Sequence, residues 1–417
     1  MSQKIDKNRL SPKKLRIAAF LAVMGPGMIA GLSDDDPAGI ATYSVLGANY
    51  GYQLLWVLVI STIALIIFQD LGARIGVVTR QGMIGLIRQK YGARSGTLSA
   101  GALILANIGT MTAEFAGIAA AGQLFGLSKY ISVPLAAILV SYLVLRNSFA
   151  RVEKIFFLIS AVFIAYIIAG FMAGPDWGSA LRGAVVPTMP FTQDAIFIAT
   201  ATFGTTLAPW GLAFIQSYAV DKRLTRDDLK LLRVDVWTGS LLTGIIGIFV
   251  VVTCAATLHK NGIQINDAAD AALALEPLAG TLAKELFAFG LIGAALLATS
   301  ILPLSTAYSV SDLTGRPAAL DDSLKEAPLF YITFAAITGL SAILILIPGA
   351  PLIKILVFTQ VLNAILLLPL LIYMYGISKD KVLMGEFVSS KKMRVIYGVI
   401  ISIVAIAICC MLWFSFN

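Results

Sequence analysis

The sequence predicts an all-α membrane protein with eleven spans, in which two inverted sets of five are followed by one further helix. This prediction rests on a strongly apolar composition, on basic residues that gather in alternate loops, and on two interrupted spans at matching places. Of the 417 residues, 58% are hydrophobic and 13% are charged. A soluble domain has roughly a quarter of its residues charged, so this composition excludes a water-soluble fold.

Eleven apolar segments are long enough to cross a hydrocarbon core of about 30 Å. The uninterrupted segments are Leu54 to Phe68, Leu98 to Leu124, Ile131 to Leu145, Ile155 to Ala173, Val236 to Leu258, Leu286 to Leu304, Leu329 to Ile347, Leu352 to Tyr373 and Val395 to Phe416. Two longer segments, Ile17 to Val45 and Ala195 to Val220, contain breaks. We therefore predict a single polytopic membrane domain over residues 1–417. Its first repeat covers about residues 15–175, its second about 192–376, and its extra helix about 394–416.

Most of the 31 Lys and Arg residues fall in every second connection between these segments. By the positive-inside rule, those connections and the N-terminus face the cytoplasm. The odd number of spans then places Asn417 outside, in a multi-pass protein of the cell membrane. Because this pattern explains the net charge of +8, the charge does not indicate a nucleic-acid partner. The lipid bilayer is the predicted partner, and no obligate protein partner is evident.

Other sequence features indicate neither a secreted protein nor an enzyme. Residues 1–16 are polar and basic, and no small-residue cleavage signature follows them, so we predict an uncleaved first span. Cys254, Cys409 and Cys410 lie in apolar segments without the spacing of a disulfide framework or metal cluster, and we expect them to be packing residues. For the single histidine, His259, we predict no specific role. We find no phosphate-cradling loop or catalytic constellation and predict no cofactor.

The first span contains the sequence GLSDDDPAGIATYS, which places Asp34 to Asp36 in its expected hydrophobic middle. One interpretation ends the helix at Leu32 and leaves the aspartates in a surface loop. However, the segment up to Leu32 is short for a span, and acidic residues within a membrane are costly and usually functional. We therefore favour a helix that breaks near residues 35–38, with Pro37 in the first turn of its second half.

The sixth span has the same organisation, because Pro209 interrupts it in the sequence TTLAPWG. Taken alone, this pattern also fits one kinked helix. The two breaks, however, occupy the first span of each set of five, and an odd number of spans inserts the second set upside down. Paired interrupted spans in inverted halves indicate a transporter with a binding site near the midplane. Freed main-chain carbonyls beside a carboxylate would form an oxygen-lined cation site there.

The sequence resembles the Nramp family of divalent-metal transporters, and most of all its branch of Nramp-related magnesium transporters. The block GPGMIAGLSDDDPAGIATYSVLGANYGYQLLW is similar to the family's first-span block around Asp-Pro-Gly-Asn. TMTAEFAG is similar to its third-span block, and TTLAPWGLAFIQS to its sixth-span Met-Pro-His block. The resemblance covers nearly the whole chain. It implies the LeuT-like fold, an inverted repeat of five plus five helices plus an eleventh, with helices 1 and 6 broken at the midplane.

Departures from the family motifs carry functional information. Asp36 and Pro37 are retained, whereas Gly39 stands at the asparagine position, Ala208 at the methionine position and Trp210 at a histidine position. In the family, the aspartate, the asparagine and the methionine sulfur are associated with coordination of a transition metal. Losing the thioether and the amide leaves a wider, oxygen-based site. Such a site suits Mg²⁺, which prefers oxygen ligands and usually keeps several waters.

The resemblance implies that Asp36 supplies the dominant charge of the metal site, with carbonyls near Ser33 and Thr205 contributing directly or through water. The predicted metal-site residues are Asp36, Ser33, Gly39, Thr205, Ala208, Gln360 and Asn363, and the predicted pocket-lining residues are Pro37, Trp210 and Met111. For Gln360 and Asn363, an interhelical hydrogen bond is an open alternative. Asp34 and Asp35 either attract cations at the outer mouth or solvate the helix break.

The resemblance also implies that proton coupling is weakened. Among the family positions associated with proton movement, Glu114 is retained, as a proton-path remnant or as a structural residue. Met111, Trp210 and Ile215 replace titratable residues, and a proton relay needs such groups at hydrogen-bond intervals. We therefore predict uptake of Mg²⁺, and also Mn²⁺, by alternating access without proton coupling. The alternatives are a proton-coupled Mn²⁺ or Fe²⁺ symporter of the Nramp type and a sodium-coupled amino-acid carrier of LeuT-like fold.

Overall fold

The computed structural model of the chain describes residue 31 and residues 34–145, 161–316 and 325–416. All regular secondary structure in these ranges is helical. The long helices are α4 (Leu55–Thr79), α6 (Ala93–Leu124), α7 (Lys129–Leu145), α13 (Leu229–Thr257), α16 (Ala283–Thr314), α17 (Pro328–Leu346), α18 (Leu352–Ser378) and α20 (Lys391–Phe416). Three helices adjoin the breaks, namely α3 (Pro37–Tyr50), α11 (Gln193–Thr206) and α12 (Pro209–Asp221).

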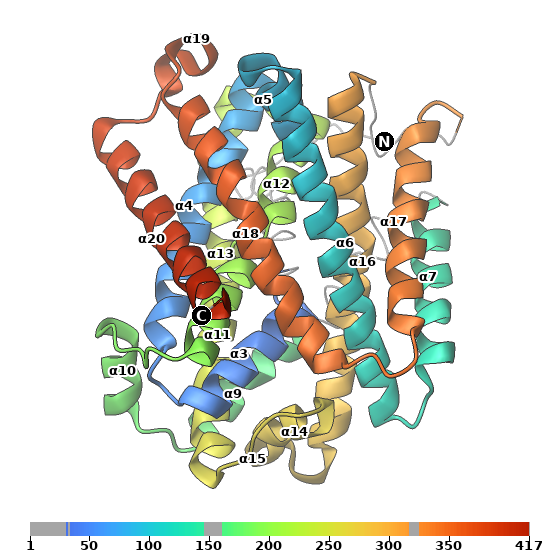
Figure 1. Cartoon of the computed structure of the whole chain (residues 1–417), viewed down its shortest axis with the longest axis vertical. Coiled ribbons are helices and arrows are strands. Elements are labelled where there is room, and N and C mark those ends of the chain that lie inside the picture. Colours follow the sequence, from blue (N-terminus) through green and yellow to red (C-terminus); the bar gives the residue numbers. More distant parts are fainter. Residues whose placement is uncertain (1–30, 32–33, 146–160, 317–324, 417) are drawn as a thin grey trace, which may run out of the picture.

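Shorter helices cover the two ends of the bundle (Figure 1). At one end lie α5 (Met83–Tyr91) and α19 (Lys381–Met384). At the other end lie α10 (Trp177–Val185), α14 (Ala268–Ala272) and α15 (Glu276–Ala279), while α9 (Ala165–Met172) packs against α13 and α15. Helix α9 lies within the predicted fifth span, whereas the other short helices are too short or too amphipathic to be recognised as membrane-length apolar segments.

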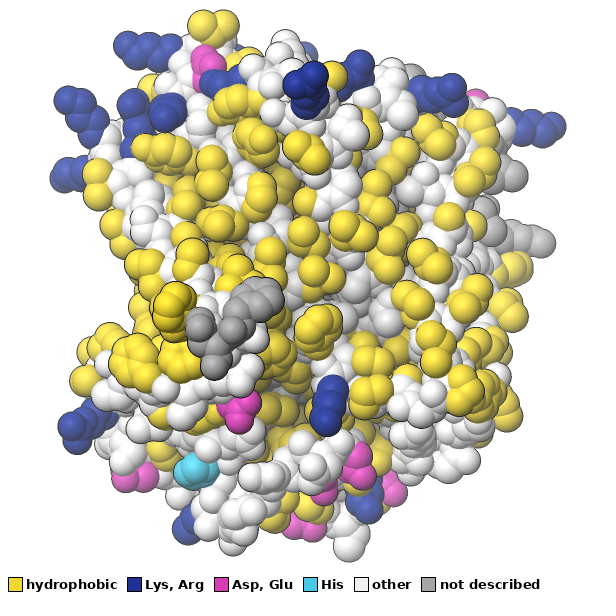
Figure 2. All heavy atoms as spheres, in the orientation of Figure 1, with side chains coloured by type: hydrophobic (Ala, Val, Ile, Leu, Met, Phe, Trp, Pro, Cys, Tyr) yellow, Lys and Arg dark blue, Asp and Glu magenta, His cyan; other side chains and the backbone are white. Residues whose placement is uncertain are grey.

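The observed helices agree with the predicted spans wherever the chain is described. In this part of the chain, 8 helical segments are long and apolar enough to cross a membrane, and Lys129–Val144 forms a shorter apolar helix. The remaining two predicted spans, the first and the fifth, lie partly outside the described residues. Figure 2 shows a broad band of hydrophobic side chains, with Lys and Arg gathered along the upper edge and both signs of charge along the lower edge. The protein is therefore a multi-pass membrane protein.

The second half of the first span lies at the centre of the bundle. Helix α3 packs against α6, α11, α13 and α18. Close approach between α11 and α18 depends on Gly204, where a β-carbon would lie 1.7 Å from the carbonyl oxygen of Gln360. Small residues at helix contacts allow such approach in membrane proteins, where dispersion and hydrogen bonds drive packing. The packing holds the breaks of spans one and six in a shared interior.

Candidate metal site

The first break lies at Asp34 to Asp36, between helical Gly31 and the start of α3. Asp36 is the N-cap of α3, and its Oδ1 accepts a hydrogen bond of 2.6 Å from the backbone N–H of Gly39. Aspartate is favoured at this position because it satisfies an N–H that has no partner in the first helical turn. All three aspartates are buried, with exposed fractions of 1%, 2% and 4%. The surface-loop interpretation is therefore wrong.

The second break lies at Leu207 and Ala208, between α11 and α12. Pro209 occupies the first turn of α12, just as Pro37 occupies the first turn of α3. Proline is tolerated there because its missing N–H would have no helical partner. The two breaks predicted from the sequence are therefore confirmed, with each second half beginning at a proline.

Oxygen atoms from both breaks converge around Gly39. A β-carbon at Gly39 would lie 2.9 Å from the carbonyl oxygen of Asp34 and 3.3 Å from both Asp36 Oδ1 and Thr205 Oγ1. Thr205 is 2% exposed, and its hydroxyl has no hydrogen-bond partner among the described residues. The absence of a side chain at Gly39 therefore leaves room between a carboxylate, a carbonyl and a hydroxyl, which are ligands that hard cations prefer.

Glu114 of α6 reaches the same place. Its side chain is fully buried and interacts directly with the carboxyl group of Asp36. Within the described part of the chain, no hydrogen-bond donor reaches either oxygen of Glu114. Two ionised carboxylates in contact repel each other. Their proximity therefore disfavours ionisation of both carboxyl groups at once, and a proton or a bound cation would relieve the repulsion.

The side chain of Asp34, unlike its carbonyl oxygen, is directed toward α4 and α12. Its Oδ2 accepts a hydrogen bond of 3.4 Å from Gln69 Nε2, and Gln69 Oε1 accepts one of 3.1 Å from Ser240. The other carboxylate oxygen, Oδ1, lies near the first turn of α12, where a β-carbon at Gly211 would be 3.5 Å away. Thr243 of α13 donates to the carbonyl of Gly31 and also approaches Asp35. Asp34 and Asp35 are thus buried within the helix break.

Gln69, Ser240 and Thr243 also belong to this environment, although no motif in the sequence marks them. All three are buried. The signal that would have found them is their polarity within the otherwise apolar second and seventh spans, because buried polar groups in membranes are usually paired or functional.

The amides of the tenth span are engaged in hydrogen bonds. Asn363 Nδ2 donates to Thr110 Oγ1 and to Gln360 Oε1, each at 2.8 Å, and Gln360 Nε2 donates to Thr359 Oγ1 at 3.2 Å. Among the contacts described, Asn363 therefore forms an interhelical hydrogen bond between α18 and α6, which is the alternative to metal binding that the sequence leaves open. Its Oδ1 is buried and has no donor in the described chain.

The predicted lining residues lie around the breaks. Met111 and Trp210 are buried in one hydrophobic cluster, with exposed fractions of 0% and 1%. The Trp210 carbonyl accepts a 3.1 Å hydrogen bond from Ser305 of α16. Pro37 packs against α6 at Gly117. Ala208 is buried and offers only a methyl group, while Ser33 lies outside the described residues.

Among the described residues, the converging groups include no histidine, cysteine or methionine sulfur. No group of three or more His, Cys, Asp or Glu side chains that could hold a metal ion occurs among the described residues. What converges instead is one capping carboxylate, a second carboxyl group in contact with it, a hydroxyl and a main-chain carbonyl. This set offers oxygen ligands alone and fits a hard cation that retains part of its hydration shell.

Long apolar helices with two facing breaks define a membrane transporter of the LeuT-like fold. One similar solved structure is the manganese transporter of Eremococcus coleocola in complex with an aromatic bis-isothiourea substituted compound. The two structures superimpose with a TM-score of 0.77 at 17% sequence identity, and the match covers 95% of this chain and 87% of the manganese transporter. Mhp1, a nucleobase-cation-symport-1 family transporter in a closed conformation, gives a TM-score of 0.56 at 12% identity, covering 94% and 93%. These likenesses show the fold.

The family of natural resistance-associated macrophage protein-like sequences, Nramp, matches residues 27–414, and the chain belongs to this family. The divalent metal cation transporter MntH of Klebsiella pneumoniae subsp. pneumoniae is 29% identical over 396 residues, which cover 92% of each chain. The protein of the same name from Yersinia pestis is 28% identical over 419 residues, which cover 96% of each chain.

Proposed function

We propose that this protein mediates uptake of Mg²⁺, and also Mn²⁺, across the cell membrane by alternating access, without proton coupling. Relatives named as divalent metal cation transporters support the general class of substrate. The observation that carries the proposal is the convergence of Asp34 O, Asp36 Oδ1 and Thr205 Oγ1 within 3.3 Å of a β-carbon position at Gly39. We accordingly assign the chain to the Nramp-related magnesium branch.

Ligand chemistry favours magnesium over softer ions. Thioether sulfur selects softer metals, and Ala208 provides none at the break of the sixth span. Mg²⁺ requires near-octahedral oxygen coordination and releases its waters reluctantly. The proposed site has one fixed carboxylate, and the absence of a side chain at Gly39 lets the ion approach its oxygens while it keeps several waters. In this proposal Asp36 binds the ion, and Thr205, the Asp34 carbonyl and a carbonyl near Ser33 complete the site directly or through water.

Gln360 and Asn363 are proposed as outer ligands. Their hydrogen bonds to Thr359 and Thr110 hold both amides in place between α18 and α6. The unpartnered Asn363 Oδ1 is the atom available to accept a hydrogen bond from a water on the ion. Water-mediated contacts of this kind are almost as favourable as direct ones.

Transport without protons needs another driving force. Met111, Trp210 and Ile215 are buried apolar residues, so the path beyond Glu114 lacks titratable side chains at these positions. An inside-negative membrane potential moves each charge inward by about 2.3 kcal/mol per 100 mV, and a divalent ion by about 4.6 kcal/mol. This gradient alone suffices for accumulation.

A second candidate is a proton-coupled Mn²⁺ or Fe²⁺ symporter. The contact between Asp36 and Glu114 favours it, because a proton shared by the two carboxyl groups would leave when a metal arrives. A sodium-coupled amino-acid carrier is disfavoured. In such carriers a half-helix N-terminus binds the substrate carboxylate, whereas here Asp34 already directs a carboxylate to the first turn of α12.

We also propose how the chain is oriented in the membrane and which residues form its two inverted repeats. The N-terminus faces the cytoplasm and the C-terminus lies outside, because the basic connections are concentrated at one end of the bundle (Figure 2). Residues 15–175 and 192–376 form the two inverted repeats. The matching prolines at the starts of α3 and α12 support this pairing.

Proteoliposomes that contain a pH dye test the function. We expect Mg²⁺ and Mn²⁺ to enter without internal acidification, and an imposed inside-negative potential to accelerate entry. Acidification in step with metal entry, together with Mn²⁺ uptake that ignores millimolar Mg²⁺, would establish the symporter instead. Liposomes without protein provide the baseline for both metals.

A further inference from the structure

A cavity separate from the predicted metal-site residues opens between α4 and the start of α13. Its volume is about 330 Å³, and the segment between α19 and α20 forms its third wall. Four basic side chains line it, namely Arg74, Arg226, Lys230 and Arg233, against two acidic ones, Asp70 and Glu386. Leucines from α13 together with Phe387 and Val388 supply an apolar lining. The cavity therefore combines an excess of positive charge with apolar walls.

The acidic residues leave much of this positive charge available. Arg233 Nε donates to Asp70 Oδ1 at 2.8 Å. Arg226 lies 3.7 Å from Glu386, but both side chains are more than half exposed, and such pairs contribute little. Arg226 also lies over the ring of Phe387, at 5.4 Å from its centroid.

Arg74 and Lys230 supply further positive charge that no ion pair among the described residues neutralises. Arg74 Nη2 donates to Ser389 Oγ at 2.9 Å and to Tyr397 OH at 3.0 Å. Both acceptors are neutral, and its buried Nε has no acceptor among the described residues. Lys230 is exposed. Arginine guanidinium groups suit phosphate, because their donors match its oxygens in pairs.

An apolar stripe continues from the cavity along α13. Val234, Trp237 and Leu241 are 51%, 52% and 51% exposed, and their spacing puts them on one face of the helix. At 1.5 Å per residue, the stripe extends roughly 10 Å from its first to its last residue. Tryptophan is enriched where lipid headgroups meet the hydrocarbon core. A charged cavity thus adjoins a surface suited to an acyl chain.

We propose that this cavity binds the phosphate of an anionic phospholipid, whose acyl chain lies along Val234, Trp237 and Leu241. Basic pockets between spanning helices bind such headgroups in other membrane proteins. The adjoining apolar stripe distinguishes a lipid from free phosphate. Because the cavity joins α4, α13 and the segment before α20, the lipid stabilises the contact between these three parts.

Lipid-dependent thermal stability tests the proposal in the full-length protein in neutral detergent. We expect phosphatidylglycerol to raise the melting temperature and phosphatidylcholine to leave it unchanged. The double variant Arg226→Gln, Lys230→Gln should bind phosphatidylglycerol about 30-fold more weakly, because each basic residue contributes about 1 kcal/mol and 1.4 kcal/mol is tenfold. Arg316→Gln with Lys325→Gln removes the same charges elsewhere and should leave binding as in the parent.

Two further experiments distinguish a phospholipid headgroup from free inorganic phosphate as the ligand. Millimolar inorganic phosphate should give a much smaller stabilisation than phosphatidylglycerol. Trp237→Ala should weaken lipid binding without changing the response to inorganic phosphate. Equal responses to phosphatidylglycerol and phosphatidylcholine, an equal loss in both double variants, or full stabilisation by inorganic phosphate would each overturn the proposal.

Discussion

The hydroxyl oxygen of Thr205 lies 3.3 Å from the place that a β-carbon of Gly39 would occupy. This relationship joins the first half of the sixth span to the second half of the first span, although the two residues are far apart in the chain. It also makes the space at Gly39 part of the proposed site. Any side chain there meets Thr205, Asp36 and the carbonyl of Asp34.

Gly39→Ala should therefore impair transport. The added methyl group would lie 2.9 Å from the Asp34 carbonyl and displace oxygen atoms that the ion needs. We expect Mg²⁺ uptake to fall on the order of tenfold, which corresponds to about 1.4 kcal/mol. Gly101→Ala is the matched control, because no atom lies within 4 Å of a β-carbon at Gly101 in α6. Equal uptake by both variants would remove Gly39 from the site.

Ala208→Met should change selectivity. It introduces a thioether at the break of the sixth span, and thioethers favour softer metals. We expect the ratio of Mn²⁺ or Cd²⁺ uptake to Mg²⁺ uptake to rise roughly tenfold. Ala208→Leu adds similar volume without sulfur and should lower uptake of all these ions together. If leucine and methionine have the same effect on the ratio, sulfur is not the determinant.

Glu114→Gln separates the two coupling schemes. The amide can donate a hydrogen bond to Asp36 but cannot take up and release a proton. Under uncoupled transport, Mg²⁺ uptake should stay within a few-fold of the parent, and internal pH should be constant in both proteins. A parent that acidifies the lumen during Mn²⁺ entry, and a variant that does not, would instead identify Glu114 as the proton carrier.

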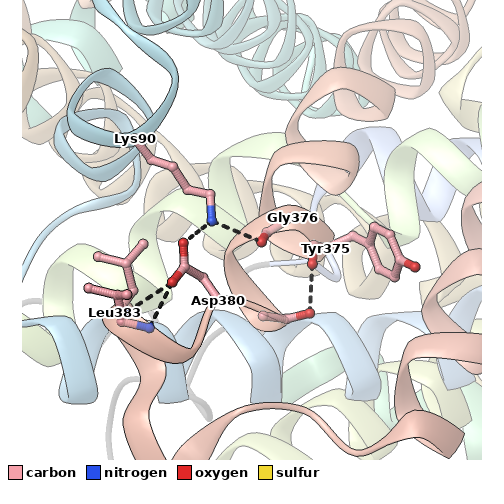
Figure 3. Close-up of polar contacts among 7 residues, drawn as sticks. Lys90, Tyr375, Gly376, Asp380 and Leu383 are labelled. Atoms are coloured by element: carbon pink, nitrogen blue, oxygen red, sulfur yellow. Dashed lines mark hydrogen bonds and ion pairs between the residues drawn. The ribbon is translucent and has the colours of Figure 1, made fainter.

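The ion pair between Lys90 and Asp380 gives a pH-dependent contribution to stability (Figure 3). Lys90 also donates to the carbonyl of Gly376 at 3.2 Å, so the pair holds α5 against the end of α18. The hydrogen bond from Lys90 lowers the pKa of Asp380 below its usual 3.8, and backbone N–H groups of α19 lower it further.

A carboxyl group whose pKa is lower in the folded state stabilises the protein at any pH above its pKa in the unfolded state. That stabilisation is lost as the pH falls through the pKa of the folded state. We expect Asp380→Asn to lower the melting temperature by a constant amount at neutral pH, and the difference from the parent to shrink below about pH 4. Asp227→Asn, at an exposed position, is the control. A difference that does not vary down to pH 2 would contradict the role of this ion pair.

Much of the fold is predictable from the sequence because its signals are local. Long apolar stretches define the spans, and Pro37 and Pro209 mark the helix starts after each break. The short helices α5 and α10 were not predicted, since they are too short to register as spans. His259, for which we predict no specific role, follows the end of α13, and its Nδ1 lies 2.9 Å from the carbonyl oxygen of Ala48 in α3, a contact that the sequence does not reveal.

The site is less predictable because it depends on contacts between distant residues. Asp36 is identifiable from its motif and its cost in a membrane. The approach of Thr205 to Gly39 and the hydrogen bond from Gln69 to Asp34 depend on how α11 and α4 pack around α3. The same packing places Asp34 against α12, which the row of three aspartates does not reveal.

The role of Asp36 is tested most directly by Mg²⁺ entry into proteoliposomes that carry Asp36→Ala, under an inside-negative potential. Asp227→Ala removes an exposed aspartate and controls for reconstitution. We expect Mg²⁺ entry through the Asp36 variant to fall to the rate of protein-free liposomes, while the control transports like the parent. Entry through Asp36→Ala at the parent's rate would contradict a metal site built on this carboxylate.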